Sequence, residues 1–254
     1  MSDQRVPVIR TVVTPSGYAR AVLAAWPLVE AEPCLKSAVG VLHSQYMIET
    51  GGTASWNWNL GNVKYTPGAG TDYMCLSGVW EGVSPGEAAR LIAAGEATAD
   101  ASADHRKAVN PSGDGTRVSV IFQPPHPATR FRAYPSLADG MIHHLKTLRG
   151  RFKGAWPYVL SGEPEQTAIA LRAQGYYTAS AQVYGAAMRR FYDAFMRSDA
   201  YEQAQDDTPT QPQLPSPPPS PASEPTIHVD KVPHWHFTDE NPRPIAIEDD
   251  DEAD

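Results

Sequence analysis

Apolar residues recur at helical spacing over five segments of the chain, which cover residues 15–33, 35–49, 136–150, 165–175 and 180–197. Within each segment the apolar positions lie three or four residues apart, as on one face of an α-helix. Pro15 suits the first turn of the first segment, and Gly175 suits the end of the fourth. The pattern therefore predicts a mainly helical body.

Strand-like patterns are confined to the region between the second and third of these helices. The segments rich in β-branched and aromatic residues are 72–83, 116–123 and 129–134. Ser84 is followed three residues later by Glu87, the capping-box pattern of a helix start. We therefore expect an α+β fold, with a small β-lobe that carries an inserted segment over residues 84–116.

The composition changes near residue 200. Residues 213–225 read QLPSPPPSPASEP and hold too little apolar surface to offset the entropy of ordering the chain. A short apolar and aromatic patch follows, and then an acidic end. His234 and His236 flank Trp235, but two candidate ligands without a third do not make a metal site. The sequence predicts a disordered tail over 200–254, and the alternative is a peptide that docks on a protein partner.

Charge is spread unevenly along the chain. Residues 201–254 hold 13 of the 29 acidic residues and 2 of the 21 basic residues, so the first 200 residues carry a net charge of about +3. A mildly basic body tolerates an anionic polymer such as cell wall, and without a basic cluster it predicts no nucleic-acid partner. No apolar stretch of about 18 residues predicts a membrane span. Cys34 and Cys75 could pair only if the fold brings them together.

Glu49 is the candidate for chemistry. It follows Leu35, Val39, Leu42 and Tyr46 at spacings of four, three, four and three residues, so it ends the inward stripe of its helix. Gly51 and Gly52 are helix terminators, which puts the carboxyl in the last turn, near the negative end of the helix dipole. Burial and the dipole both favour the neutral acid and raise its pKa. On helix pattern alone, an acid that merely caps or pairs at a helix end remains an alternative.

The loop after Glu49 changes the balance between these interpretations. It supplies Trp56 and Trp58 as flat apolar faces, and Asn57, Asn59 and Asn62 as amide donors and acceptors. Aromatic faces beside amides suit a sugar polymer. The pattern indicates a carbohydrate site with Glu49 as the acid.

Residues 44–64, SQYMIETGGTASWNWNLGNVK, resemble the signature of bacterial glucosaminidases of glycoside hydrolase family 73. The matching positions are Glu49, Thr50, Gly51, Ser55, Asn59, Gly61 and Lys64. Two further blocks follow in family order: residues 129–148 resemble the FRxYxS strand with its helix, and residues 171–188 resemble the Gly-Tyr-x-Thr segment. The likeness covers roughly residues 14–197.

The resemblance implies a lysozyme-like fold, in which a helical body faces a small β-lobe across a substrate groove. It implies cleavage of β-1,4 bonds in peptidoglycan on the N-acetylglucosamine side, without metal or cofactor. By the same resemblance Glu49 is the catalytic acid and Tyr176 lines the cleft near it, although core packing of Tyr176 is the alternative. The residues expected to contact substrate are Ser55, Trp56, Trp58, Asn59, Lys64, Asp72 and Tyr177. The domains are then an arm over 1–13, a glucosaminidase-like domain over 14–199 and the tail.

The chain departs from the family at the second carboxylate. The family's Thr-x-Glu strand has only GVWEG as its counterpart here, so Glu81 is the first candidate and Asp72 the second. Either could activate water or act as the nucleophile, and the substrate's own N-acetyl group is a third option. The segment 84–116 is longer than the turn that is usual in the family, which would reshape one end of the groove or cover it.

Other functions remain open at this stage. A muramidase or a lytic transglycosylase would share the fold, and a non-catalytic wall-binding or assembly module would use the groove without cutting. Residues 1–13 lack the apolar core of a signal peptide. This predicts a protein made in the bacterial cytoplasm that reaches the wall by a non-classical route, such as a phage tail or an injection apparatus, with the tail docking on its carrier.

Overall fold

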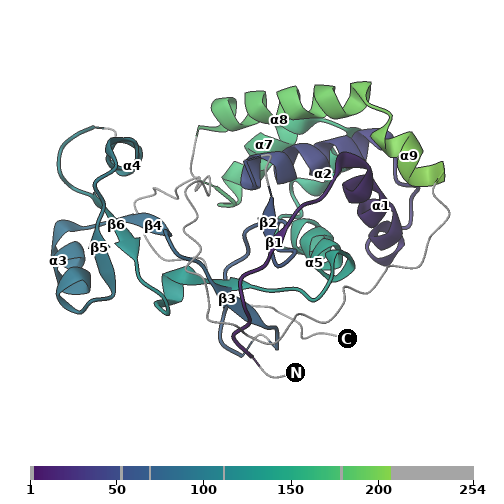
Figure 1. Cartoon of the computed structure of the whole chain (residues 1–254). Coiled ribbons are helices and arrows are strands. Elements are labelled where there is room, and N and C mark those ends of the chain that lie inside the picture. Colours follow the sequence, from purple (N-terminus) through teal and green to yellow (C-terminus); the bar gives the residue numbers. More distant parts are fainter. Residues whose placement is uncertain (1–2, 52–53, 69, 111, 178–179, 207–254) are drawn as a thin grey trace.

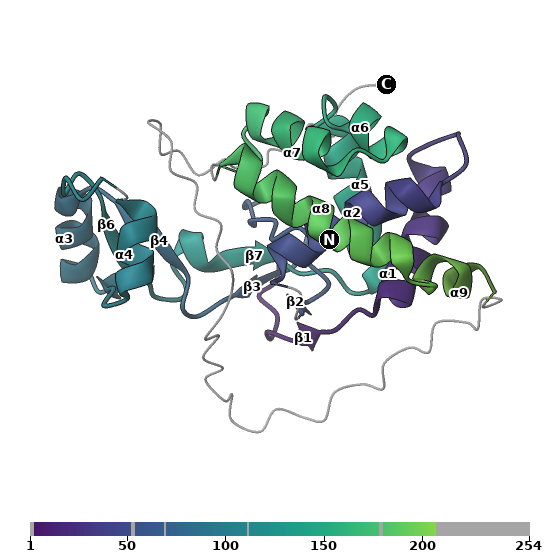
Figure 2. The same ribbon diagram turned by 90° about the horizontal axis from the view of Figure 1, so that it is seen from above.

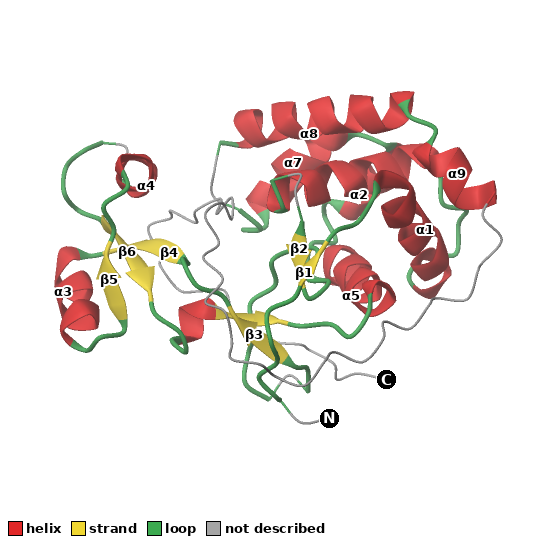
Figure 3. Cartoon of the chain, viewed as in Figure 1, coloured by secondary structure: helices red, strands yellow, loops and turns green. Residues whose placement is uncertain are grey.

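The computed structural model describes residues 3–51, 54–68, 70–110, 112–177 and 180–206. About half of the described residues are helical, and the strands among them form a few small sheets, so the fold is α+β. Figure 1 shows most of the helices gathered in one body, with a smaller unit of strands and two helices that stands apart from it. Figure 3 shows that both parts contain helices and strands.

The helical body contains every helix that the apolar spacing predicts. These helices are α1 (Pro15–Ala25, continued by the 3₁₀ turn Trp26–Leu28), α2 (Lys36–Glu49), α5 (Leu137–Gly150), α7 (Pro164–Ala173) and α8 (Ala181–Arg197). The short α6 (Trp156–Ser161) was not predicted. Thr14 caps α1 by accepting a hydrogen bond from the Gly17 amide, which fixes where this helix begins.

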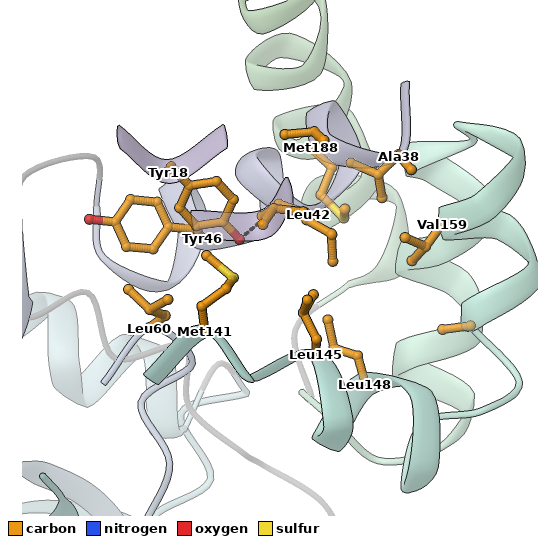
Figure 4. Close-up of a cluster of buried hydrophobic side chains, with 14 of the residues drawn as sticks. Tyr18, Ala38, Leu42, Tyr46, Leu60, Met141, Leu145, Leu148, Val159 and Met188 are labelled. Carbon is orange, nitrogen blue, oxygen red and sulfur yellow. Dashed lines mark hydrogen bonds between the residues drawn. The ribbon is translucent and has the colours of Figure 1, made fainter. Parts of the chain in front are cut away.

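Helix α2 lies at the centre of the body and is buried on nearly all sides. Helix α8 lies across it, and α1, α6 and α7 also pack against it (Figure 2). Leu42 sits among Met188, Leu145 and Val159, and the Tyr18 hydroxyl donates a hydrogen bond to the Leu42 carbonyl at 3.1 Å (Figure 4). The inward stripe is confirmed from Val39 to Glu49, but Leu35 precedes the helix and is exposed.

The strands form three small sheets instead of one lobe. Strands β1 (Arg10–Thr11) and β2 (Ser55–Trp56) pair, as do β3 (Tyr73–Cys75) and β7 (Arg130–Arg132), and all these pairs are antiparallel. A third sheet has the order β4 (Trp80–Val83), β6 (Val118–Phe122), β5 (Ala97–Ala99). The segment 72–83, which the sequence predicts as one strand, therefore supplies two strands in different sheets, with a turn at Gly78 where φ is +76°.

Residues 80–122 form the outlying unit, which contains β4, β5, β6, α3 (Pro85–Ala93) and α4 (Ala103–Val109). The Ser84 hydroxyl accepts a hydrogen bond from the Glu87 amide at 3.2 Å, so the predicted capped helix is confirmed. This unit has a small apolar cluster of its own, made by Ala88, Leu91, Ala97, Val120 and Phe122. The insertion is thus a packed unit and not an extended turn.

Two predicted boundaries differ from the extent of the packed elements. The arm 1–13 belongs to the fold, because β1 pairs with β2 and the Val6 amide bonds to the Tyr73 carbonyl. The body does not stop at residue 199, because α9 (Ala200–Asp206) packs on α1. Both segments lack the long apolar pattern that marks an element in a sequence, and their partners are distant in the chain. Residues 207–254, including His234 and His236, lie outside the described residues.

Removing α9 should destabilise the body. A chain that ends at Asp199 loses the burial of Ala200 and Ala204 and the hydrogen bond from the Tyr201 hydroxyl to the Cys34 carbonyl at 2.6 Å. We expect a loss of about 2 kcal/mol, or a Tm lower by roughly 4–8 °C. A chain that ends at Asp206 is the control and should keep its Tm within about 2 °C. Equal melting of the two chains would show that α9 does not stabilise the body.

Candidate active site

The site is built on the end of helix α2. Helix α2 ends at Glu49 because Thr50 leaves helical geometry and Gly51 adopts φ of +60°, a left-handed conformation that favours glycine. The Thr50 hydroxyl donates to the Tyr46 carbonyl at 2.8 Å, which satisfies one of the last carbonyls of the helix. Glu49 exposes only 8% of its surface, as the apolar stripe predicts.

The Glu49 carboxyl has a specific hydrogen-bond partner. The Tyr184 hydroxyl on α8 donates to Glu49 Oε1 at 2.8 Å, and the Asn62 side-chain amide donates to the Glu49 backbone carbonyl at 2.6 Å. Burial raises the pKa of Glu49 to about 7, while the Tyr184 and Asn62 side chains oppose this shift. The Tyr184 hydroxyl therefore engages Oε1, one of the two carboxyl oxygens.

The Tyr184 ring is held in place by a stacking contact with Tyr177. Its ring stacks on Tyr177 with centroids 3.9 Å apart, and the Tyr177 hydroxyl donates to the Ala168 carbonyl at 2.8 Å. Tyr177 is only 1% exposed. Its ring and hydroxyl are both used inside the protein, so these contacts do not support the predicted binding of substrate by Tyr177. Its role is to position Tyr184.

Tyr176 lies on the same side of Glu49. Burial raises its pKa well above the usual value, and the charge of Glu49 adds to the shift, so the two side chains are electrostatic neighbours. The Gln45 side chain lies near its buried hydroxyl and opposes this shift. Gly61 leaves room beside it, because a Cβ there would lie 3.4 Å from the Tyr176 hydroxyl and 3.0 Å from His144 Nδ1. Tyr176 is thus near the acid, as the resemblance implies.

The loop after α2 uses its amides for its own structure. Asn59 is 1% exposed, donates to the Val63 and Arg132 carbonyls at 2.9 and 3.0 Å, and accepts from the Val63 amide. Asn57 likewise bonds to the backbone of the N-terminal arm at Pro7 and Ile9. Both hydrogens of the Asn59 amide are therefore used inside the protein, and its Oδ1 already accepts one hydrogen bond, so these contacts do not support the predicted contact of Asn59 with substrate.

Ser55 is also an internal residue. It is 2% exposed, and its hydroxyl lies 2.8 Å from the Thr11 hydroxyl, between β2 and β1. These contacts do not support the predicted contact of Ser55 with substrate. The pairing of β1 with β2, which the sequence did not indicate, is what buries Ser55.

The two tryptophans of the loop are half-buried. Trp56 packs against the apolar cluster of β3 and β7, and its backbone pairs with Arg10. Trp58 has φ of +57°, an unusual conformation for a bulky residue, and lies against Gly140 at the start of α5. Both rings keep some exposed surface, so their contact with a ligand stays a prediction.

Lys64 and Glu81 form a pair at the edge of the body. Lys64 Nζ lies 3.4 Å from Glu81 Oε1, donates to the Ala128 carbonyl at 2.5 Å and lies over the Phe131 ring. The segment from Asn62 to Lys64 thus touches Glu49 at one end and Glu81 at the other. Glu81 is half-exposed on β4, in the outlying unit.

Asp72 is hydrogen-bonded to the N-terminal arm. Its carboxylate accepts a hydrogen bond from the Gln4 amide at 3.3 Å, and its carbonyl accepts from the Ala133 amide. These contacts join the N-terminal arm to β3 and β7. Nothing in them connects Asp72 with Glu49, so Glu81 remains the first candidate for a second carboxylate.

Sequence reasoning missed the partners of the acid. Tyr184 is part of the apolar stripe of α8, where an aromatic residue is indistinguishable from core. His144 is 3% exposed, and burial lowers its pKa to about 4, so it is neutral beside Gly61. The Gly-Tyr block does contain Tyr184, but only the fold brings it to Glu49.

No protein-family model matches the chain, and no curated protein or solved structure is significantly similar to it. In the parts of the chain that the structure describes, no helix is both long and apolar enough to cross a bilayer. The described residues include no group of three or more His, Cys, Asp or Glu side chains placed to hold a metal ion. Cys34 and Cys75 are free thiols.

Proposed function

We propose that the protein is a peptidoglycan hydrolase with a lysozyme-like fold, which cleaves β-1,4 glycosidic bonds on the N-acetylglucosamine side with Glu49 as general acid. The observation that carries this proposal is the buried Glu49 carboxyl, whose pKa of about 7 suits proton donation near neutral pH. The ordered motif blocks that resemble glucosaminidases support the choice of substrate. The environment of Glu49 supports the choice of acid.

The proposed reaction begins with proton transfer from the Glu49 carboxyl to the leaving glycosidic oxygen. The Tyr184 hydroxyl donates to Oε1 at 2.8 Å and so orients the carboxyl. As the leaving group departs, positive charge develops at the anomeric carbon and requires a carboxylate, a water molecule or the substrate's N-acetyl group. The anionic form of Glu49, left after the transfer, is stabilised by the same Tyr184 hydrogen bond.

Glu81 is proposed as the second carboxylate. It is half-exposed and paired with Lys64, so it stays available to solvent and to a water nucleophile. Trp56 and Trp58 are proposed as the sugar platforms, because both are half-buried aromatic residues of the segment that leads from Glu49 to Lys64. The cell-wall substrate, the non-classical delivery and the docking of the tail on a carrier remain parts of this proposal.

Glu81→Gln should slow turnover while wall binding stays nearly unchanged. The substitution keeps the size of the side chain and removes its charge, so we expect kcat to fall by roughly two orders of magnitude or more on purified peptidoglycan. Asp72→Asn is the matched control. If Asp72→Asn lowers kcat and Glu81→Gln does not, the second carboxylate is Asp72. Normal rates in both variants would favour assistance by the substrate.

A further inference from the structure

An open groove of about 640 Å³ lies on the outlying unit, away from Glu49. It is bounded by α3, by α4 with the loop that follows, and by strands β5 and β6. The unit projects from the helical body in Figure 1, so α3 and α4 face solvent beside the groove. The proposed glycosidase chemistry makes no use of this surface.

The floor of the groove is apolar. Ala88 and Val120 belong to the buried cluster of the unit, and Val118 packs against that cluster. Ile92 also lines the groove and leaves 42% of its surface exposed. An exposed branched side chain above an apolar floor favours a ligand that carries aliphatic groups.

The rim of the groove is cationic. Arg106 and Lys107 are exposed in the last turn of α4, and within the described residues neither forms an ion pair. Arg117 donates from Nη2 to the Gly82 carbonyl, while its buried Nε has no partner among the described residues. Arg106 and Lys107 are exposed and can receive carboxylates, and Arg117 adds a further positive charge to the rim.

The acidic groups near the groove are already engaged. Asp100 accepts hydrogen bonds from the Ser119 hydroxyl at 2.6 Å and the Ser102 amide at 2.9 Å, and lies 2.8 Å from His105 Nδ1. Asp114 accepts from the Thr116 amide and hydroxyl at 2.9 and 2.7 Å. The groove therefore presents a net positive rim to a ligand.

We propose that this groove binds the chain's own acidic segment 244–254, PIAIEDDDEAD. The segment has an apolar part and an acidic part that match the two surfaces of the groove. Ile245 and Ile247 match the apolar floor, and the run from Glu248 to Glu252 matches the cationic rim. Its acids are also the densest in the chain. Binding would place this segment on the outlying unit.

The connecting chain is long enough for this contact. Residues 207–243 supply 37 residues between α9 and the segment. They can span up to about 120–130 Å when extended and about 30–37 Å on average as a flexible coil, against a radius of gyration of roughly 16 Å for a body of this size. Tethering raises the effective concentration of the segment to about the millimolar range, so even a weak intrinsic affinity populates the bound form.

The test is a measurement on the isotope-labelled full chain by NMR. In 0.1 M salt the backbone amides of 244–254 should relax faster than those of 213–225, and their difference should shrink at 1 M salt, where the Debye length falls from about 10 Å to about 3 Å. Arg106→Glu with Lys107→Glu should weaken docking about tenfold. Lys146→Glu with Lys153→Glu, two exposed positions of the helical body, is the matched control and should leave it unchanged.

A charge swap makes the test specific. Glu248→Lys with Asp250→Lys should release the segment from the wild-type groove and restore docking to the Arg106→Glu, Lys107→Glu chain. The proposal would be overturned if the relaxation rates of the amides of 244–254 changed neither with salt nor with these variants. A salt-sensitive effect that grows with protein concentration would also overturn it, in favour of a second copy. Groove resonances that respond to added peptidoglycan stem peptide, with the tail unbound, would assign the groove to substrate instead.

Discussion

Glu49→Gln is expected to lower the rate of peptidoglycan cleavage by about two to four orders of magnitude while the fold is kept. Gln has the size of Glu and still accepts the Tyr184 hydrogen bond, but it has no proton to give to the glycosidic oxygen. The measurement is the release of new reducing ends from purified peptidoglycan. N-acetylglucosamine at those ends supports the proposed specificity, whereas muramic acid would favour a muramidase.

The pH dependence of the free energy of unfolding of Glu49→Gln shows whether this variant is folded. The pKa of Glu49 is about 7 in the folded protein and near 4.3 in an unfolded chain, so the folded state loses stability as pH rises from about 4 to 7. Gln removes that loss, and Glu49→Gln should therefore be more stable than the wild type at pH 8, by up to about 4 kcal/mol. Glu32→Gln, at an exposed position, is the control for both measurements.

A folded Glu49→Gln chain with near-normal rates would falsify the assignment of the acid. Cleavage that persists while the pH dependence of stability disappears would mean that Glu49 is buried and titrates but donates no proton to substrate. A wild type that binds the wall and releases no reducing ends at any pH would favour the non-catalytic binding module.

Gly140→Ala is expected to destabilise the protein although it adds a good helix former. A Cβ at Gly140 would lie 2.1 Å from the Trp58 carbonyl oxygen, far inside van der Waals contact with backbone. Overpacking of this kind should outweigh the helix propensity of Ala and cost about 2–3 kcal/mol, or a Tm lower by roughly 5–10 °C. Activity should fall too, because the displaced loop carries Asn62 away from Glu49.

Gly150→Ala on the same helix is the matched control. Nothing lies within 4 Å of a Cβ built at Gly150, so the only effect there is a gain of about 0.5–1 kcal/mol from helix propensity. The two substitutions should therefore move the Tm in opposite directions. Equal shifts in thermal melting would show that the loop does not rest on α5 at Gly140.

The long helices could be predicted from the sequence because their signals are local. The spacing of Val39, Leu42 and Tyr46 and the glycine after Thr50 fix both the buried face of α2 and the turn at which it ends. The same spacing and the same glycine predict that Glu49 lies at the buried end of α2. A carboxyl at the end of a buried stripe, with a raised pKa, was therefore predictable from residues 35–52 alone, and burial is its first physical cause.

The roles of the neighbouring polar residues depended on contacts far along the chain. Asn59 had the composition of a sugar ligand, but the Arg132 carbonyl, 73 residues away, uses its amide. Ser55 is buried by Thr11 through the pairing of β1, and Tyr177 by Ala168. A side chain binds a ligand only if the fold leaves its donors and acceptors unpaired, and a one-dimensional pattern does not contain that information.

By itself, then, the sequence determined the helical body, the capped helix of the insertion and the position of the acid, since periodicity, caps and turn residues act within a few positions. Only the tertiary structure decided that Tyr184, 135 residues from Glu49, holds the carboxyl, and that the arm and α9 belong to the body. The tertiary structure likewise split the strands into separate sheets and gave the outlying unit a groove of its own. These features arise from packing between distant segments, where the free energy depends on which surfaces meet and not on local propensity.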